Sequence, residues 1–374
     1  MNENSSDRRG PHAMAAEPSP METLRCVSII APCRNERAHI DAFLDGALAQ
    51  TVPSGWRAEV LVADGESDDG TAERLRARAR EDVRIKVVAN PGRIVSSGLN
   101  LCLAQAQGEV IVRMDVHTRF AEDYLAECIA ALQRTGADNV GGAWVAEGEG
   151  PMGQAIAAAF QSRWVVGGAR SRDQAYEGEV DTVYLGCWPR ASFERYGDFD
   201  EALVRNQDDE HNLRLRLAGG CIWQSALIRS WYRPRETLGH LFRQQYQYGY
   251  WRPFVMRKHG KPGSARQLVP AVFVAALVLT SLLASLWPLP WLALLAAYAL
   301  YVGAASMLVV AGEAGSRAKT SSPLGPACLI GSSFARLVLV VSTYHLAYGL
   351  GSWRGVLDLA LGRRVSSEIA KITR

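Results

Sequence analysis

The chain has 374 residues, which is enough for two domains and a large hydrophobic core. Its 41 Lys and Arg side chains nearly balance its 38 Asp and Glu side chains, and the net charge of +3 excludes the strongly basic surface of a nucleic-acid-binding protein. The seven cysteines form no CxxC pair. The sequence therefore favours neither a zinc site nor a disulfide framework, and reduced cytosolic thiols are the simplest interpretation.

Residues 1–24 are mostly polar and are expected to form a disordered tail that lacks the apolar stretch of a signal peptide. After this tail, short apolar strands alternate with segments that suit helices. Strands are expected at residues 26–31, 59–63, 84–89 and 110–114, and helices at residues 39–50, 72–80, 94–107 and 123–134. This alternation predicts an α/β domain with a parallel, doubly wound sheet over residues 25–235.

Polar residues stand where the predicted strands end. Pro32 opens the loop after the first strand, and Asp64 and Asp115 follow the second and fourth strands. Open α/β sheets bind ligands at the carboxyl ends of their strands, so these positions are expected along one rim. The sequence contains no GxGxxG motif after the first strand and no GxxxxGK[ST] motif, which argues against a dinucleotide-binding dehydrogenase and a P-loop enzyme.

The most informative stretch is the predicted strand at 110–114 followed by Asp115 and His117. Side chains alternate along an extended chain, so these two residues can point to the same side just past the strand end. A carboxylate and an imidazole aimed at one spot suit a divalent cation that holds a diphosphate. An ordinary polar turn after a strand would give the same pattern, and both interpretations stay open.

A second acidic centre opens a predicted helix at residues 206–217. Asp208 could act there as a general base over a substrate pocket. Alternatively, the acidic residues could only stabilise the helix N-terminus through its dipole. Between the two acidic centres, we expect a strand at residues 139–145, a helix at residues 151–172 and an aromatic loop at residues 184–190.

The C-terminal part of the sequence has the composition of a membrane region. Residues 268–312 contain no Asp, Glu, Lys or Arg, and these 45 residues are long enough for two spans, at about 268–287 and 291–312. Basic residues flank the pair on both sides, which places these flanks and the N-terminal domain in the cytoplasm by the positive-inside rule. A third apolar segment at residues 327–351 contains an arginine, and one more crossing would put the basic tail at residues 352–374 outside. A re-entrant or interfacial segment therefore stays open there.

The membrane region is assigned to residues 267–351, and residues 236–266 precede it as an amphipathic segment rich in Arg, Gln and aromatic side chains. Aromatic residues at the bilayer edge are expected as interfacial anchors. The same segment could also close the active site and receive a lipid-linked acceptor, so two interpretations stand.

Five motifs in this order resemble the family 2 glycosyltransferases of the GT-A fold, over residues 26–257. The motifs are the strand with its Asn-Glu pair at residues 27–36, the nucleotide loop at 62–71, the Gly-containing segment at 90–100, Asp115-Val116-His117 in place of Asp-x-Asp, and Gln207-Asp208 in place of Glu-Asp. The organisation is similar to that of membrane-attached transferases of bacterial exopolysaccharide assembly, such as succinoglycan synthesis.

The resemblance implies roles for individual residues. It makes Asp208 the catalytic base, and it makes Asp115 and His117 the ligands of Mn²⁺ or Mg²⁺. The residues that it places at the nucleotide are Pro32, Asn35, Glu36, Asp64, Arg93 and Asp115. The candidate acceptor contacts are Gly186, Trp188, Arg190, Gln244, Gln245 and Trp251. Two residues depart from the family pattern: His117 is a softer ligand than Asp, and Gln207 leaves Asp208 without a carboxylate neighbour, so we expect Asp208 to be ionised.

The expected function is an inverting sugar transfer from a nucleoside-diphosphate donor, with a UDP-sugar favoured, to a lipid-linked or polysaccharide acceptor. The expected location is the cytoplasmic face of the inner (plasma) membrane, in exopolysaccharide biosynthesis. A processive polysaccharide synthase is an alternative, but the short membrane region argues against a secretion channel. A second alternative is a non-catalytic membrane scaffold that only binds nucleotide, and the presence of Asp64, Asp115 and Asp208 argues against it. A third is a soluble nucleotidyltransferase, and the hydrophobic hairpin argues against it.

Overall fold

The computed structural model describes residues 25–234, 236–317 and 326–363. The predicted N-terminal tail and residues 364–374 of the predicted basic C-terminal tail lie outside these residues. The larger of two sheets runs in the order β3 (Ile85–Ala89), β2 (Trp56–Asp64), β1 (Arg25–Cys33), β4 (Val110–Arg113), β9 (Cys187–Pro189), β6 (Asn139–Gly141), β10 (Ile222–Gln224) and β8 (Gly178–Glu179). Strands β3, β2, β1 and β4 are parallel, as the alternation predicts.

The sheet as a whole is mixed, because β9 lies antiparallel to both β4 and β6. Residues 184–190, predicted to be a loop, therefore contain a strand in the middle of the sheet. Cys187 and Trp188 are buried there, and the apolar β4 offers them a partner strand. Burial of these side chains thus overrides the turn-like composition of the stretch.

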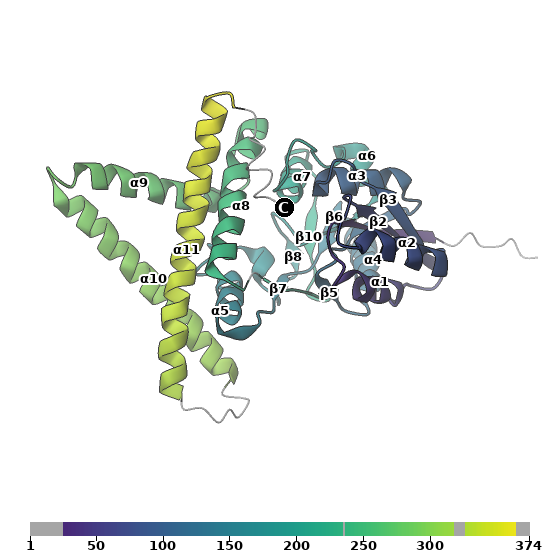
Figure 1. The fold of residues 1–374 in the computed structure, drawn as a ribbon, viewed down its shortest axis with the longest axis horizontal. Helices are drawn as coiled ribbons and strands as arrows, with labels where there is room; N and C mark the ends of the chain where they lie inside the picture. The colour runs from purple at the N-terminus through teal and green to yellow at the C-terminus, as the bar shows by residue number, and fades with distance from the viewer. Residues whose placement is uncertain (1–24, 235, 318–325, 364–374) are drawn as a thin grey trace, which may run out of the picture.

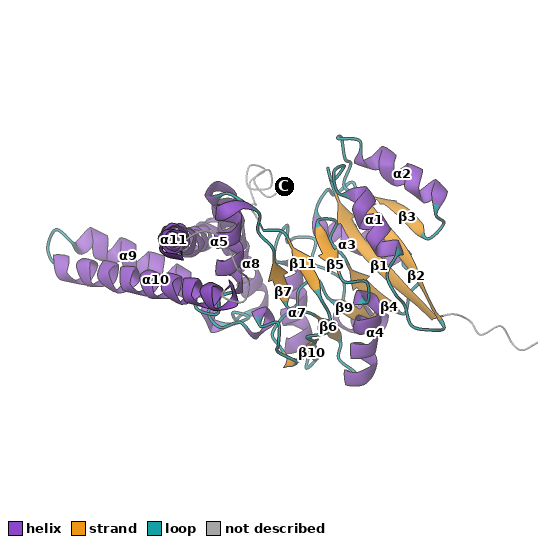
Figure 2. Cartoon of the chain, turned by 90° about the horizontal axis from the view of Figure 1, so that it is seen from below, coloured by secondary structure: helices purple, strands orange, loops and turns teal. Residues whose placement is uncertain are grey.

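Helices cover both faces of this sheet because side chains alternate along its strands. Ile29 and Val112 face α1 (Ile40–Leu48), α2 (Thr71–Glu81) and α4 (Tyr124–Thr135), whereas Ile30 and Ile111 face α3 (Val95–Gln105), α6 (Arg190–Tyr196) and α7 (Gln207–Leu217). Figure 2 shows the parallel strands with helices packed on them. The four helices predicted between the first strands and residue 134 are confirmed.

A small second sheet lies between the main sheet and the C-terminal helices. Its strands are β5 (Thr118–Phe120), β11 (Ser230–Tyr232) and β7 (Trp144–Ala146). The single strand predicted at 139–145 is therefore wrong, because the chain changes sheets between β6 and β7. The change happens at Gly142, where an added Cβ would come within 1.7 Å of the Ile228 carbonyl oxygen.

The helix predicted at residues 151–172 is shorter, since α5 (Gly150–Gln161) ends before a loop and a 3₁₀ turn at Arg170–Arg172. Gly167 and Gly168 both have positive φ, 70° and 69°, which a continuing helix does not allow. This loop crosses toward the C-terminal helices and brings Arg172 to the cavity described below.

Four long helices complete the chain, α8 (Leu238–His259), α9 (Val269–Leu283), α10 (Pro288–Arg317) and α11 (Pro326–Ala360), with a 3₁₀ turn at Ala265–Gln267 before α9. Among the described residues, three segments are long and apolar enough to cross a membrane, at Ala265–Leu283, Pro288–Gly312 and Ser333–Ala360. Leu282 and Leu300 are about three-quarters exposed at 74% and 76%, as expected for side chains that meet lipid. The chain is thus membrane-associated, and the third apolar segment forms one continuous helix.

Helices α8 and α11 lie side by side between the α/β part and the hairpin of α9 and α10 (Figure 1). Their backbones approach closely at Gly249 and Gly351, where an added Cβ would lie 2.0 Å from a carbonyl oxygen of the facing helix. Tyr250 on α8 donates a hydrogen bond to Asp358 on α11 (3.1 Å). This packing joins the α/β part of the molecule to its membrane part.

Candidate active site

A cavity of about 590 Å³ lies between the carboxyl ends of β1 and β4, the N-terminus of α7 and the helices α8, α10 and α11. It extends from the rim of the sheet to residues of the membrane segments, such as Tyr301 and Tyr344. The residues singled out in the sequence that line it are Pro32, Glu36, Arg93, Asp115, His117, Asp208, Gln244 and Gln245. Residues that are far apart in the chain therefore converge here.

Asp115 is held by Arg113, the last residue of β4. The Arg113 guanidinium donates two hydrogen bonds to the Asp115 carboxylate, at 2.9 and 3.0 Å. Its remaining nitrogen, Nη1, is buried without a hydrogen-bond partner in the described part of the chain and lies 3.9 Å from Asp208 Oδ2. Burial opposes the charge of Arg113, but Asp115 and Asp208 raise its pKa above the usual value. Arg113 therefore stands as a fixed cation between the two carboxylates.

Asp208 stands in the first turn of α7 and faces the cavity, so that 40% of its side chain stays exposed. Burial inside the molecule raises the pKa of this carboxyl, and the neighbouring Asp209 raises it further, while Arg113 opposes both effects. The expectation that Asp208 has no carboxylate neighbour is therefore wrong. Asp209 supplies the negative charge that Gln207 lacks, and a base with a raised pKa binds a proton more readily.

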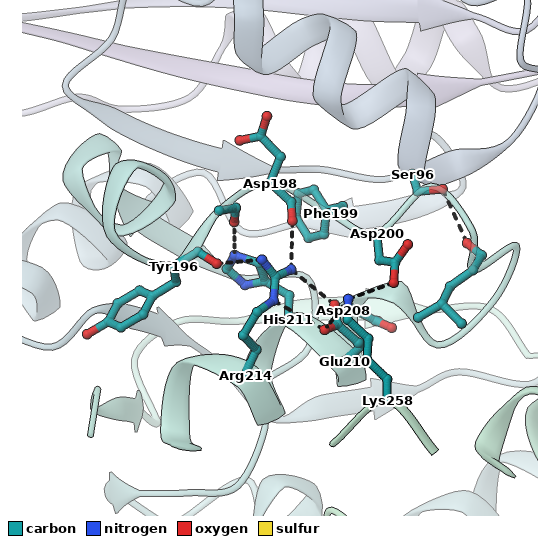
Figure 3. Close-up of polar contacts among 12 residues, drawn as sticks. Ser96, Tyr196, Asp198, Phe199, Asp200, Asp208, Glu210, His211, Arg214 and Lys258 are labelled. Carbon is teal, nitrogen blue, oxygen red and sulfur yellow. Dashed lines mark hydrogen bonds and ion pairs between the residues drawn. The ribbon is translucent and has the colours of Figure 1, made fainter. Parts of the chain in front are cut away.

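Helix α7 is fixed by a network of ion pairs, shown in Figure 3. Glu210 is fully buried and accepts hydrogen bonds from Arg214 (3.0 Å) on its own helix and from Lys258 and His259 (2.9 Å each) on α8. Arg252 of α8, which lines the cavity, binds the adjacent Asp209 at 2.6 Å. These contacts tie the turn that carries Asp208 to the helix that packs on the membrane part.

In another part of the cavity, the loop after β1 is hydrogen-bonded to the loop after β2. Asn35 accepts a hydrogen bond from the backbone N–H of Asp68 (3.0 Å), and Asp64 accepts one from the Ser67 hydroxyl (2.6 Å). Asn35 and Asp64 do not line the cavity; their neighbours Glu36 and Gly65 do. The structure thus places Asn35 and Asp64 behind the cavity wall, where they shape the loops that form it.

The residues at the end of β4 can supply only part of a metal site. His117 Nδ1 lies 3.7 Å from Glu36 Oε1, and Asp115 is bound to Arg113. No group of three or more His, Cys, Asp or Glu side chains that could hold a metal ion occurs within the described ranges. Mg²⁺ is commonly bound by one or two protein groups together with substrate phosphates. Asp115 and His117 fit a cation of this shared kind.

Several predicted acceptor contacts lie away from the cavity wall. Trp188 is buried against Phe193, and Trp251 is buried against Tyr250. Arg190 donates to the carbonyl oxygens of Gly108 (2.7 Å) and Ala106 (2.6 Å), so it holds a loop at the far end of β4. Gly186 is also outside the wall. These four residues support the fold of the region and do not face the cavity.

Other aromatic residues line the cavity instead of the predicted ones. Trp144 of β7 stacks on Tyr184 with ring centroids 5.4 Å apart, and Tyr232 of β11 packs against Trp144 at 4.9 Å. All three line the cavity, together with Gln244 and Gln245 of α8. An aromatic wall with nearby amide groups suits a sugar, which has both apolar faces and hydroxyls. In the sequence, only the aromatic character of these residues indicated a surface for a sugar.

Comparisons with known proteins indicate a glycosyltransferase. The family described as "Glycosyl transferase family 2" matches residues 28–195. "Succinoglycan biosynthesis protein ExoA" of Rhizobium meliloti (strain 1021) is 32% identical over 340 residues, which cover 90% of this chain and 96% of that protein.

Two more distant relatives are informative. One is a dolichyl N-acetyl-alpha-D-glucosaminyl phosphate 3-beta-D-2,3-diacetamido-2,3-dideoxy-beta-D-glucuronosyltransferase of Methanococcus voltae. It is 27% identical over 241 residues, which cover 62% of this chain and 74% of that protein. The solved structure of the mannosyltransferase PcManGT from Pyrobaculum calidifontis, in complex with GDP-Man and Mn²⁺, superimposes with a TM-score of 0.53 at 19% identity, covering 92% of this chain and 91% of that one. At this identity the likeness shows the shared fold alone.

Proposed function

Because the chain belongs to glycosyltransferase family 2, we propose that it transfers a sugar from a nucleoside-diphosphate donor to a lipid-linked or polysaccharide acceptor, with inversion at the anomeric carbon. The chain is a glycosyltransferase, and its similarity to the succinoglycan protein supports a role in exopolysaccharide biosynthesis. The observation that carries the proposal is the position of Asp115 and Asp208 on either side of Arg113 in one cavity.

In the proposed reaction Asp208 accepts the proton of an acceptor hydroxyl. The oxygen then forms a bond to the anomeric carbon as the bond between that carbon and the diphosphate breaks. The nucleoside diphosphate leaves with the bonding electrons, and Arg113 supplies a positive charge near it. One base suffices because no covalent enzyme intermediate forms. Asp115 and His117 would hold Mn²⁺ or Mg²⁺, which would neutralise charge on the diphosphate when bound.

For the donor, the loop that includes Pro32 and Glu36 is proposed to hold the nucleoside, with Asp64 behind it and Arg93 near the diphosphate. A UDP-sugar is favoured by the resemblance of the 62–71 loop to its family counterpart. For the acceptor, the wall formed by Trp144 and Gln245 offers a surface for a sugar. The proposed location is the cytoplasmic face of the inner (plasma) membrane, with α9 and α10 as crossings.

A thermal-shift panel on the detergent-solubilised full chain tests the donor and the cation together. UDP-, GDP- and dTDP-sugars are added with and without Mn²⁺, to the parent protein and to Asp115→Ala. We expect one donor to raise the melting temperature of the parent more with Mn²⁺ than without it, and Asp115→Ala to lose this metal-dependent gain. A metal titration of Asp115→Ala that matches the parent would remove the cation role of Asp115, and a panel without any stabilising donor would contradict the proposed function.

A further inference from the structure

The wall of the cavity contains an arginine that forms no ion pair with a carboxylate of the described residues. Arg252 is paired with Asp209 (2.6 Å), and Arg266 is paired with Asp181. Arg172 lines the same part of the cavity, yet it forms no ion pair with any residue of the described chain. Its guanidinium carbon lies 3.7 Å above the ring of Trp144.

The surroundings of Arg172 make an unpaired charge costly. Burial lowers the pKa of this side chain, which is the signature of a cation removed from water. Asp209 acts on it from nearby, but Asp209 is already bound to Arg252. Arg172 is half-buried, and an arginine stays protonated in proteins, so its charge in the cavity wall favours an anion beside it. Stacking on an aromatic ring leaves the guanidinium edge available to donate hydrogen bonds.

The position of Arg172 indicates where such an anion comes from. Arg172 shares the cavity wall with Tyr248 of α8 and Tyr344 of α11, where the catalytic part meets the membrane part, and both tyrosines act on its charge. The cavity wall continues from there along Pro270 of α9 and Tyr301 of α10, both within segments that can cross a membrane. An anion that arrives on this side can therefore carry an apolar tail into the membrane region.

Asp208 lines the same cavity as Arg172. Tyr248 of α8 lines it too, and its pKa is affected by the charges of both residues. A molecule held at Arg172 can thus extend past Tyr248 to the base. Guanidinium groups bind phosphate through paired, charge-assisted hydrogen bonds. We propose that Arg172 binds the phosphate of a lipid-linked acceptor and so orients the acceptor glycan toward Asp208. This inference rests on the proposed function and names the chemical class of the acceptor.

Titration of the detergent-solubilised full chain with three probes tests the site: geranylgeranyl phosphate, geranylgeraniol and inorganic phosphate. The variants are Arg172→Gln, Arg172→Lys and the control Arg80→Gln, which changes an exposed arginine on α2. We expect Arg172→Gln to weaken binding of geranylgeranyl phosphate about tenfold to a hundredfold, as for a lost charge-assisted contact. Arg172→Lys should lose less, Arg80→Gln should match the parent, and geranylgeraniol should bind all four proteins alike.

Unchanged affinity of Arg172→Gln for geranylgeranyl phosphate would overturn the proposal. Inorganic phosphate that binds as tightly as geranylgeranyl phosphate would also overturn it and assign the site to a soluble anion. Nucleotide-sugar binding, measured in the same samples, should not change. Its absence from the parent would count against the proposed function and not against this site.

A second measurement needs no variant and so does not depend on how Arg172→Gln folds. Phenylglyoxal modifies accessible arginine side chains, and mass spectrometry reports the extent at each position. We expect geranylgeranyl phosphate to protect Arg172 in the parent protein while Arg80 stays equally reactive. Equal modification of Arg172 with and without the lipid phosphate would contradict the proposal.

Discussion

Two carboxylates face the same cavity in different electrostatic states. Asp115, after β4, is only 16% exposed and accepts two hydrogen bonds from Arg113. Asp208, in α7, is 40% exposed, stands 3.9 Å from the same guanidinium and is followed directly by Asp209. The first carboxylate has a close, buried counter-charge, and the second has a more distant one together with a like charge.

This difference separates two tasks. A carboxylate that accepts two hydrogen bonds from a buried guanidinium is held in one position, which suits binding of a diphosphate and its cation. A carboxylate whose pKa is raised by burial and by a neighbouring acid accepts a proton more readily, which suits a general base. The fold supplies both environments because Asp115 follows a central strand and Asp208 stands in the first turn of a helix that α8 holds in place.

The largest expected effect is the loss of the base. Asp208→Asn keeps the size of the side chain but cannot accept the proton, so sugar transfer should fall about 10³-fold. Donor affinity should stay close to that of the parent, because the substitution leaves Arg113 and Asp115 in place. Transfer rates with a radiolabelled donor, beside nucleotide binding by calorimetry, measure the two effects separately. Near-normal turnover would remove Asp208 from the mechanism.

A smaller loss is expected at the cation between the two carboxylates. Arg113→Met leaves Asp115 buried without its partner and takes a positive charge away from the leaving group, so transfer should fall about 100-fold. Arg113→Lys keeps the charge but not the two-pronged contact, and should retain more activity. Arg119→Gln, which removes an exposed pair with Glu147, is the matched control and should leave the rate unchanged. If Arg113→Met transferred as well as Arg119→Gln, Arg113 would have no part in the reaction.

The smallest expected effect concerns the pH dependence of transfer. Asp208 must be ionised to act, so the rate should fall as the pH drops through its raised pKa. Asp209→Asn removes a like charge and should lower that pKa, which moves the acidic limb of kcat/KM toward lower pH. Asp123→Asn, at an exposed pair with Arg229, should leave the profile in place. A limb that moves toward higher pH in Asp209→Asn would contradict the assigned cause.

The sequence allowed the N-terminal half of the fold to be predicted well, because its strands are apolar runs that alternate with helices of ordinary length. It did not predict β9, since the composition around Trp188 resembles a turn, and only its burial against β4 makes it a strand. The wall formed by Trp144 and Tyr184 depends on strands from two separate sheets, which no local pattern reveals.

One residue of the site could have been found earlier. The alternation that places Asp115 and His117 on one side of the chain also places Arg113 there, two residues before Asp115. Arg113 stands in an otherwise apolar run, which predicts a buried strand and gives no signal of a charged residue at a site. Asp209 follows the base directly in the sequence, but the family pattern concerns the residue before the base, which is Gln207. Arg172 could not have been placed, since the loop that carries it reaches the cavity only through the tertiary fold.

The stereochemistry of the product tests the central claim most directly, because a single base at Asp208 permits only one displacement at the anomeric carbon. Transfer from a donor of known anomeric configuration, followed by proton NMR of the new glycosidic bond before any equilibration, gives the answer. Our account predicts that the anomeric configuration is inverted. A product that retains the donor's configuration would require a second nucleophile at the cavity and would contradict the mechanism.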